Sequence, residues 1–157
     1  METITINVYR DDVYDEVAKA TDYTGSKLMD GDEGARERIL AGDAELADLG
    51  RLWDESALAA NESLKEMLVS GQTGEDKDSG RVRYEAKIEV SLSFDKGLAG
   101  SVESALRSYF VASVTGQWFK YANKGEAADY FGQAAEWMES AKRMLYSRRK
   151  PRRPAEA

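Results

Sequence analysis

Residues 81–94 read RVRYEAKIEVSLSF, and apolar and polar side chains alternate along the whole stretch. One face of this segment would carry Val82, Tyr84, Ala86, Ile88, Val90, Leu92 and Phe94. The opposite face would carry Arg81, Arg83, Glu85, Lys87, Glu89, Ser91 and Ser93. This period of two predicts a long strand in an antiparallel sheet, because such a sheet can leave one face in water. The rest of the chain must therefore supply a partner strand and helices that cover the apolar face.

The best candidate for a partner strand is TITINVY, residues 3–9, in which isoleucine and valine alternate with polar residues. Two strands alone are marginally stable unless helices or a strand of another chain cover them. Two interpretations of the long strand therefore stay open. It is either an internal strand packed on helices or an edge that pairs with a neighbouring subunit. In the second case the residues of the possible intersubunit strand are Arg83, Glu85, Lys87 and Glu89.

Apolar residues at intervals of three and four predict helices in most of the remaining chain. We expect these helices at residues 12–24, 34–41, 44–69, 95–121 and 127–147. The last two are long and are separated only by the break NKGE, which predicts an antiparallel helical hairpin. Residues 70–80, SGQTGEDKDSG, contain no large apolar side chain and predict a mobile loop.

Together these elements predict a mainly helical α+β fold, in which a helical bundle with a long C-terminal hairpin packs on a small antiparallel β element. A chain of 157 residues suits one domain with a sizeable core. We therefore expect a single domain over residues 1–147 and an extended basic tail over residues 148–157.

The residue types argue against an enzyme. The sequence contains no Cys and no His, which removes thiol nucleophiles, the commonest general base and the commonest transition-metal ligand. Two carboxylate clusters lack the spacing of an EF-hand and are explained by helix capping and solubility; they comprise Asp11, Asp12, Asp15 and Glu16, and Asp30, Asp32 and Glu33. The aromatic residues of 109–137 follow helical spacing, which favours a core over a cofactor site. We expect no catalytic residues, no metal and no cofactor.

Nothing in the sequence predicts export or a membrane. The first residues, METITINVYRDD, lack the basic and apolar parts of a secretory signal. No apolar run approaches the roughly 20 residues that a spanning helix needs. We therefore expect a protein made in the cytoplasm that has no membrane partner.

Charge is distributed unevenly along the chain. Residues 1–80 hold 20 acidic and 8 basic side chains, whereas residues 81–157 hold 9 acidic and 14 basic ones. Five of these basic residues crowd into the tail as Arg148, Arg149, Lys150, Arg152 and Arg153. Pro151 and Pro154 prevent a helix from continuing there, so the tail should be an extended arm with an anionic partner. That partner is either an acidic protein face, which we favour because arginine pairs with carboxylates in fixed geometry, or DNA. The alternative is a tail that only keeps the protein soluble.

A resemblance adds to this interpretation. Residues 109–153 read YFVASVTGQWFKYANKGEAADYFGQAAEWMESAKRMLYSRRKPRR, with an aromatic WFK helix, a short NKGEA break and a basic ending. This run resembles an uncharacterised family of virion structural proteins from prophages of gut bacteria. The segments DEVAKATDYTGSKLMD and RLWDE also look like that family. The design of a helical hairpin with a tail is similar to head-to-tail connector adaptors of bacteriophages.

The resemblance implies a non-catalytic neck or adaptor subunit located in the virion and made in the cytoplasm of the host bacterium. Its partners would be copies of itself in a ring, neighbouring virion proteins such as portal or tail-completion proteins, and DNA in transient contact within a channel. Two alternatives stay open. One is a nucleic-acid-binding protein that uses the basic tail, and the other is a cytosolic scaffolding protein that binds a partner through the helical hairpin.

Overall fold

The computed structural model describes residues 1–28, 46–122 and 124–149. Along the chain it contains β1 (Glu2–Tyr9), α1 (Arg10–Leu28), α3 (Leu46–Leu64), β2 (Leu68–Glu75), β3 (Val82–Val90), a 3-10 turn (Lys96–Leu98), α4 (Ala99–Ala122) and α5 (Lys124–Tyr146). The mainly helical α+β class, the small antiparallel sheet and the C-terminal helical hairpin are confirmed. The helix expected at residues 34–41 lies outside the described residues.

The sheet has three strands in the order β1, β3, β2, and both pairings are antiparallel. The predicted face of the long strand is correct over its main part, since Tyr84, Ala86, Ile88 and Val90 are all buried. Leu92, also expected on that face, is 67% exposed because β3 has ended at Val90. In the sheet, Ile88 lies opposite Ile4 of β1 on one side and Leu68 of β2 on the other.

The prediction of a mobile loop at residues 70–80 is wrong for its first half. Residues Leu68–Glu75 form β2, and the connection to β3 is a short turn. The backbone N–H of Asp76 donates to the carbonyl of Arg81 at 2.8 Å, and that of Gly80 donates to the carbonyl of Asp76 at 2.7 Å. Gly80 has a φ of 70°, which glycine adopts without strain. Ladder hydrogen bonds to β3 thus organise a segment that has almost no apolar side chains of its own.

The possible intersubunit strand is also a wrong expectation. Because β3 is the central strand, its backbone groups are used on both sides within the chain, by β1 and by β2. Lys87 and Glu89 are exposed and Arg83 and Glu85 half-buried, and their side chains point to the face of the sheet that the core does not cover. The unpaired edges of the described sheet belong to β1 and β2.

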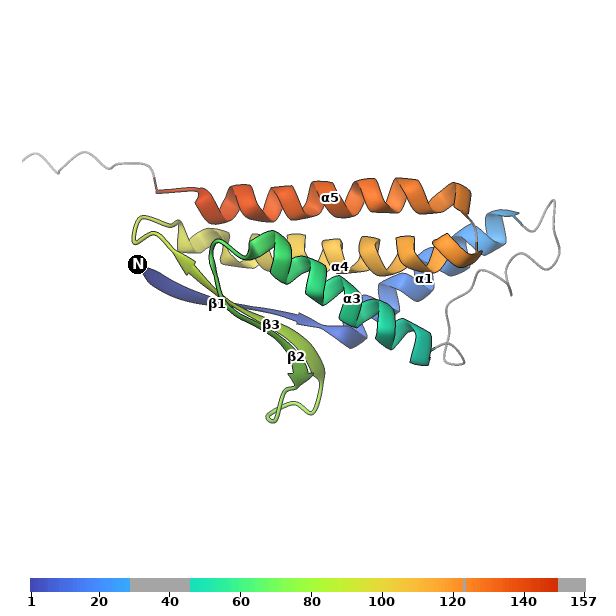
Figure 1. Cartoon of the computed structure of the whole chain (residues 1–157), viewed down its shortest axis with the longest axis horizontal. Helices are drawn as coiled ribbons and strands as arrows, with labels where there is room; N and C mark the ends of the chain where they lie inside the picture. The colour runs from blue at the N-terminus through green and yellow to red at the C-terminus, as the bar shows by residue number, and fades with distance from the viewer. Residues whose placement is uncertain (29–45, 123, 150–157) are drawn as a thin grey trace, which may run out of the picture.

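Helix α4 is the centre of the fold. It packs against α1, α3, α5 and β1, and Figure 1 shows α5 lying along α4 on the side away from the sheet. The core between α3, the sheet and α4 is aromatic. The ring of Phe110 lies 4.6 Å from that of Trp53 and 5.1 Å from that of Tyr84, measured between centroids. Burying such rings supplies a large part of the hydrophobic stabilisation of the fold.

A small polar cluster fixes α3 against α4 within this core. The hydroxyls of Ser56 and Ser113 are 2.7 Å apart, and the hydroxyl of Tyr109 donates to the carbonyl of Ser56 at 2.8 Å. Gln117 donates to both serine hydroxyls at 3.2 Å. Because these buried groups satisfy one another, the two helices have one preferred register.

The basic tail was expected to separate from the folded domain at residue 148, but Arg148 and Arg149 form backbone contacts with it. Arg148 forms an isolated antiparallel bridge with Phe94, and the backbone N–H of Arg149 donates to the carbonyl of Ser93 at 2.7 Å. These backbone bonds hold the end of α5 beside the turn that follows β3. Lys150, Arg152 and Arg153 lie outside the described residues, and the tail as a separate segment stays a prediction from residue 150 onward.

Candidate functional site

A groove lies on the surface between α1 and α5, with α4 as its floor. Its volume is about 660 Å³. The wall from α1 carries Asp12, Asp15, Glu16 and Lys19, the floor carries Arg107, Ser108, Val111 and Ala112, and the wall from α5 carries Tyr130, Gln133 and Trp137. The groove exists because α1 and α5 both pack on α4 and leave a strip of its surface open between them.

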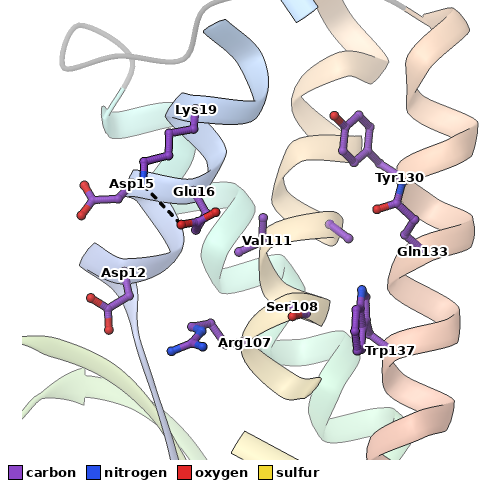
Figure 2. Close-up of a pocket in the computed structure, with 11 residues that line it drawn as sticks. Asp12, Asp15, Glu16, Lys19, Arg107, Ser108, Val111, Tyr130, Gln133 and Trp137 are labelled. Carbon is purple, nitrogen blue, oxygen red and sulfur yellow. Dashed lines mark ion pairs between the residues drawn. The ribbon is translucent and has the colours of Figure 1, made fainter. Parts of the chain in front are cut away.

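Figure 2 shows how these side chains follow one another along the groove. Arg107 and Trp137 lie at the end nearer the start of α1, and Lys19 and Tyr130 lie at the other end. The carboxylates of Asp15 and Glu16 come from the part of α1 between the two ends. The groove therefore has a mainly acidic wall facing a mainly aromatic one.

The carboxylates of the acidic wall differ in the hydrogen bonds and ion pairs that they already form within the chain. Asp12 accepts a hydrogen bond from Arg81 of the β2–β3 turn at 2.9 Å. The guanidinium of that arginine also lies over the ring of Tyr9, 4.3 Å from its centroid. Among the residues that the structure describes, Glu16 pairs with Lys19 of the same helix, at 3.5 Å, and both side chains are more than half exposed. An exposed pair of this kind contributes little and can exchange partners.

Two charged groups of the groove have no ion-pair partner among the residues that the structure describes, and they have opposite signs. They are Asp15 on the wall and Arg107 on the floor. An unpaired carboxylate and an unpaired guanidinium within one groove favour a ligand that carries both signs, or a basic ligand restricted to the part near the carboxylates.

Helix α5 carries aromatic side chains that a helix of a monomer would be expected to bury. Trp137 is 42% exposed and Phe131, on the same helix, is 40% exposed. Tyr130 is held more firmly, because its ring stacks on that of Phe119 at 5.4 Å. The sequence placed Phe131 and Trp137 in the core stripe of this helix. They instead flank the buried stripe, which is built by Ala127, Ala134, Met138, Ala141 and Leu145.

Beyond Trp137 the groove continues as a shallower depression along the first half of α4. Its floor is made of small residues, namely Gly97, Gly100, Ser101, Ser104, Ala105 and Ser108. Ser108 and Trp137 line both hollows, so the two form one continuous surface. Small side chains let another chain approach the helix closely, with the indole as a neighbouring apolar contact.

The residues predicted as sites from the sequence do not come together at this groove. Arg148 and Arg149 have exposed side chains at the far end of α5, and β3, with Arg83, Glu85, Lys87 and Glu89, crosses the middle of the sheet. Of the first carboxylate cluster, Asp12, Asp15 and Glu16 line the groove. The second cluster lies outside the described residues. Within residues 1–28, 46–122 and 124–149 no group of three acidic side chains is arranged to hold a metal ion.

No helix among the described residues is long and apolar enough to span a membrane. Comparison of the chain with protein-family models, with curated proteins and with solved structures gives no match.

Proposed function

We propose that the protein is a non-catalytic structural subunit of a bacteriophage virion that assembles into a ring, as the adaptor subunits of a head-to-tail connector do. The observation that carries this proposal is the exposure of large aromatic side chains along α5. Phe131 is 40%, Trp137 42% and Tyr146 60% exposed. Aromatic residues are enriched where proteins contact one another, because their burial at an interface contributes much of the binding free energy.

The distribution of the remaining surfaces fits a head-to-tail assembly. The groove lies between α1 and α5, the free edge of β2 borders the sheet, and the basic chain end begins beside Ser93. These surfaces are chemically different and lie on different parts of the subunit. Contacts between unlike surfaces produce rings when the rotation between copies closes.

The virion location rests on the sequence resemblance to prophage structural proteins. In this proposal the neighbours of the ring are a portal or tail-completion protein, and DNA passes through its channel. The uneven charge along the chain supports the same arrangement, since an acidic first half and a basic end give each copy complementary faces.

The test is the mass of the assembly in solution. We expect mass photometry of the purified chain to show a monomer or weak oligomer, and co-expression with a portal protein, the proposed neighbour, to give a discrete ring. Replacing Phe131 and Trp137 together by alanine should abolish the ring without changing the fold. Leu58→Ala, which removes a side chain 69% exposed on α3, is the matched control. A stable dimer with or without the partner would contradict the proposal, and DNA binding by a monomer that forms no ring would support the nucleic-acid alternative.

A further inference from the structure

We propose that the groove between α1 and α5 receives the basic C-terminal segment, residues 150–157, of a neighbouring copy of the chain. This inference rests on the proposed function, because it names the contact that would join one copy to the next.

The segment reads KPRRPAEA and combines two kinds of group. Pro151 and Pro154 favour an extended polyproline conformation, which aromatic-lined grooves recognise with little loss of chain entropy. Arg152 and Arg153 lie between the prolines, and guanidinium groups pair with carboxylates in bidentate geometry. A receptor for this segment therefore needs an exposed aromatic ring beside acidic side chains.

The groove provides that combination. The indole of Trp137 is 42% exposed on one wall, and Asp15 and Glu16 stand on the other. Arg107 lies close to the Trp137 end of the groove in Figure 2 and repels arginine there. The proline-containing part of the segment is thus favoured beside Trp137. Its arginines are favoured farther along, where Asp15 is unpaired and Glu16 can exchange its exposed Lys19 partner for an arginine.

The length of the chain indicates that the occupant comes from another copy. Arg149 is fixed to the carbonyl of Ser93 by a 2.7 Å hydrogen bond, beyond the end of α5 at Tyr146. About 20 Å of helix separates Tyr146 from Gln133, the groove residue of α5 that faces the carboxylates. Residues 150–153 span at most about 14 Å when fully extended. The backbone of the two arginines in the same chain therefore does not reach the level of Gln133, whereas the backbone of an adjacent copy has no such restriction.

The first experiment measures binding of a labelled peptide of residues 147–157 to the chain truncated after Arg149, by fluorescence anisotropy. We expect saturable binding that weakens steeply with salt. Trp137→Ala and the pair Asp15→Lys and Glu16→Lys should each weaken it at least tenfold. The pair Asp54→Lys and Glu55→Lys, the same charge change at two exposed positions of α3, should change the affinity less than twofold. Equal effects of the groove and α3 charge reversals would overturn the proposal.

The second experiment locates the segment in the full chain and uses the absence of native cysteine. A Gln133→Cys variant is mixed with an Ala155→Cys variant in the presence of the ring-forming partner and then oxidised. We expect a disulfide-linked dimer of the two variants, and no such dimer when Leu58→Cys replaces Gln133→Cys. A Gln133→Cys, Ala155→Cys double variant that forms the disulfide only within one chain would show that the arm folds back, contrary to the proposal.

The two proposals fail separately. If the chain truncated after Arg149 still forms rings with the partner, the groove contact is wrong and the ring function stands. If the peptide binds the groove and the full chain forms no ring, the groove contact stands and the connector function is wrong.

Discussion

Ile88 is the residue whose truncation tests the sheet arrangement most directly. Its side chain is fully buried in the central strand, opposite Ile4 on one side and Leu68 on the other. Ile88→Ala removes three carbon atoms from this position, and the cavity cannot close without moving strands that are held by two hydrogen-bond ladders. Large-to-small substitutions of this kind cost about 2–5 kcal/mol, and we expect about 3–4 kcal/mol here because the site is rigid.

That loss is a large part of the total stability, which is about 5–15 kcal/mol for a typical domain. For a chain of this length it corresponds to a fall in melting temperature of about 6–16 °C. The urea midpoint should fall by about 1.5–2 M for a denaturant slope near the middle of the usual range. Circular dichroism during thermal and urea unfolding measures both quantities.

The control is Lys87→Ala, one residue earlier in the same strand. Lys87 is exposed on the uncovered face of the sheet, so its truncation removes no buried contact and should cost less than about 1 kcal/mol. Equal destabilisation by the two substitutions would show that the strand does not present alternate residues to the core, and the packing of β3 on the helices would be refuted.

Two further predictions concern the contact between β2 and α3. Gly71→Ala should lower the free energy of unfolding by about 1–3 kcal/mol, because the new methyl group displaces the side chain of Asn61. That side chain donates a hydrogen bond to the carbonyl of Gly71 at 3.1 Å and accepts one from the hydroxyl of Tyr84 at 2.6 Å. Gly74→Ala, with no atom within 4 Å of the added carbon, should be nearly neutral in the same urea melts, and a similar loss at both glycines would contradict the role of Asn61. Burial raises the pKa of Tyr84, so the folded state holds this proton more tightly and loses stability as pH rises above the unfolded value of about 10. Tyr84→Phe should therefore show a shallower decline of unfolding free energy between pH 9 and 11 than the parent chain, and an unchanged decline would contradict this assignment.

The sequence by itself determined the elements whose side chains repeat with a clear period. Alternation over residues 81–94 predicted a strand and its buried face, correctly from Val82 to Val90, because every second side chain of a strand points the same way. The spacing of apolar residues in α3, α4 and α5 specified those helices, and the short break between the last two required a hairpin. These features depend on local backbone geometry, which the spacing of apolar residues in the sequence reflects directly.

Only the tertiary structure decided which of these elements lie side by side. β2 has glycine, glutamine and threonine where a predicted strand would have apolar residues. It forms because the backbone edge of β3 pairs with it and because Asn61 of α3 donates a hydrogen bond to the carbonyl of Gly71. That pairing makes β3 central rather than an edge. The groove could not be predicted from the sequence either, since Asp15 and Trp137 are 122 positions apart in it. They line one groove because α1 and α5 pack on α4 without covering it. Helical period alone cannot distinguish an aromatic side chain that the bundle buries from one that borders an open groove.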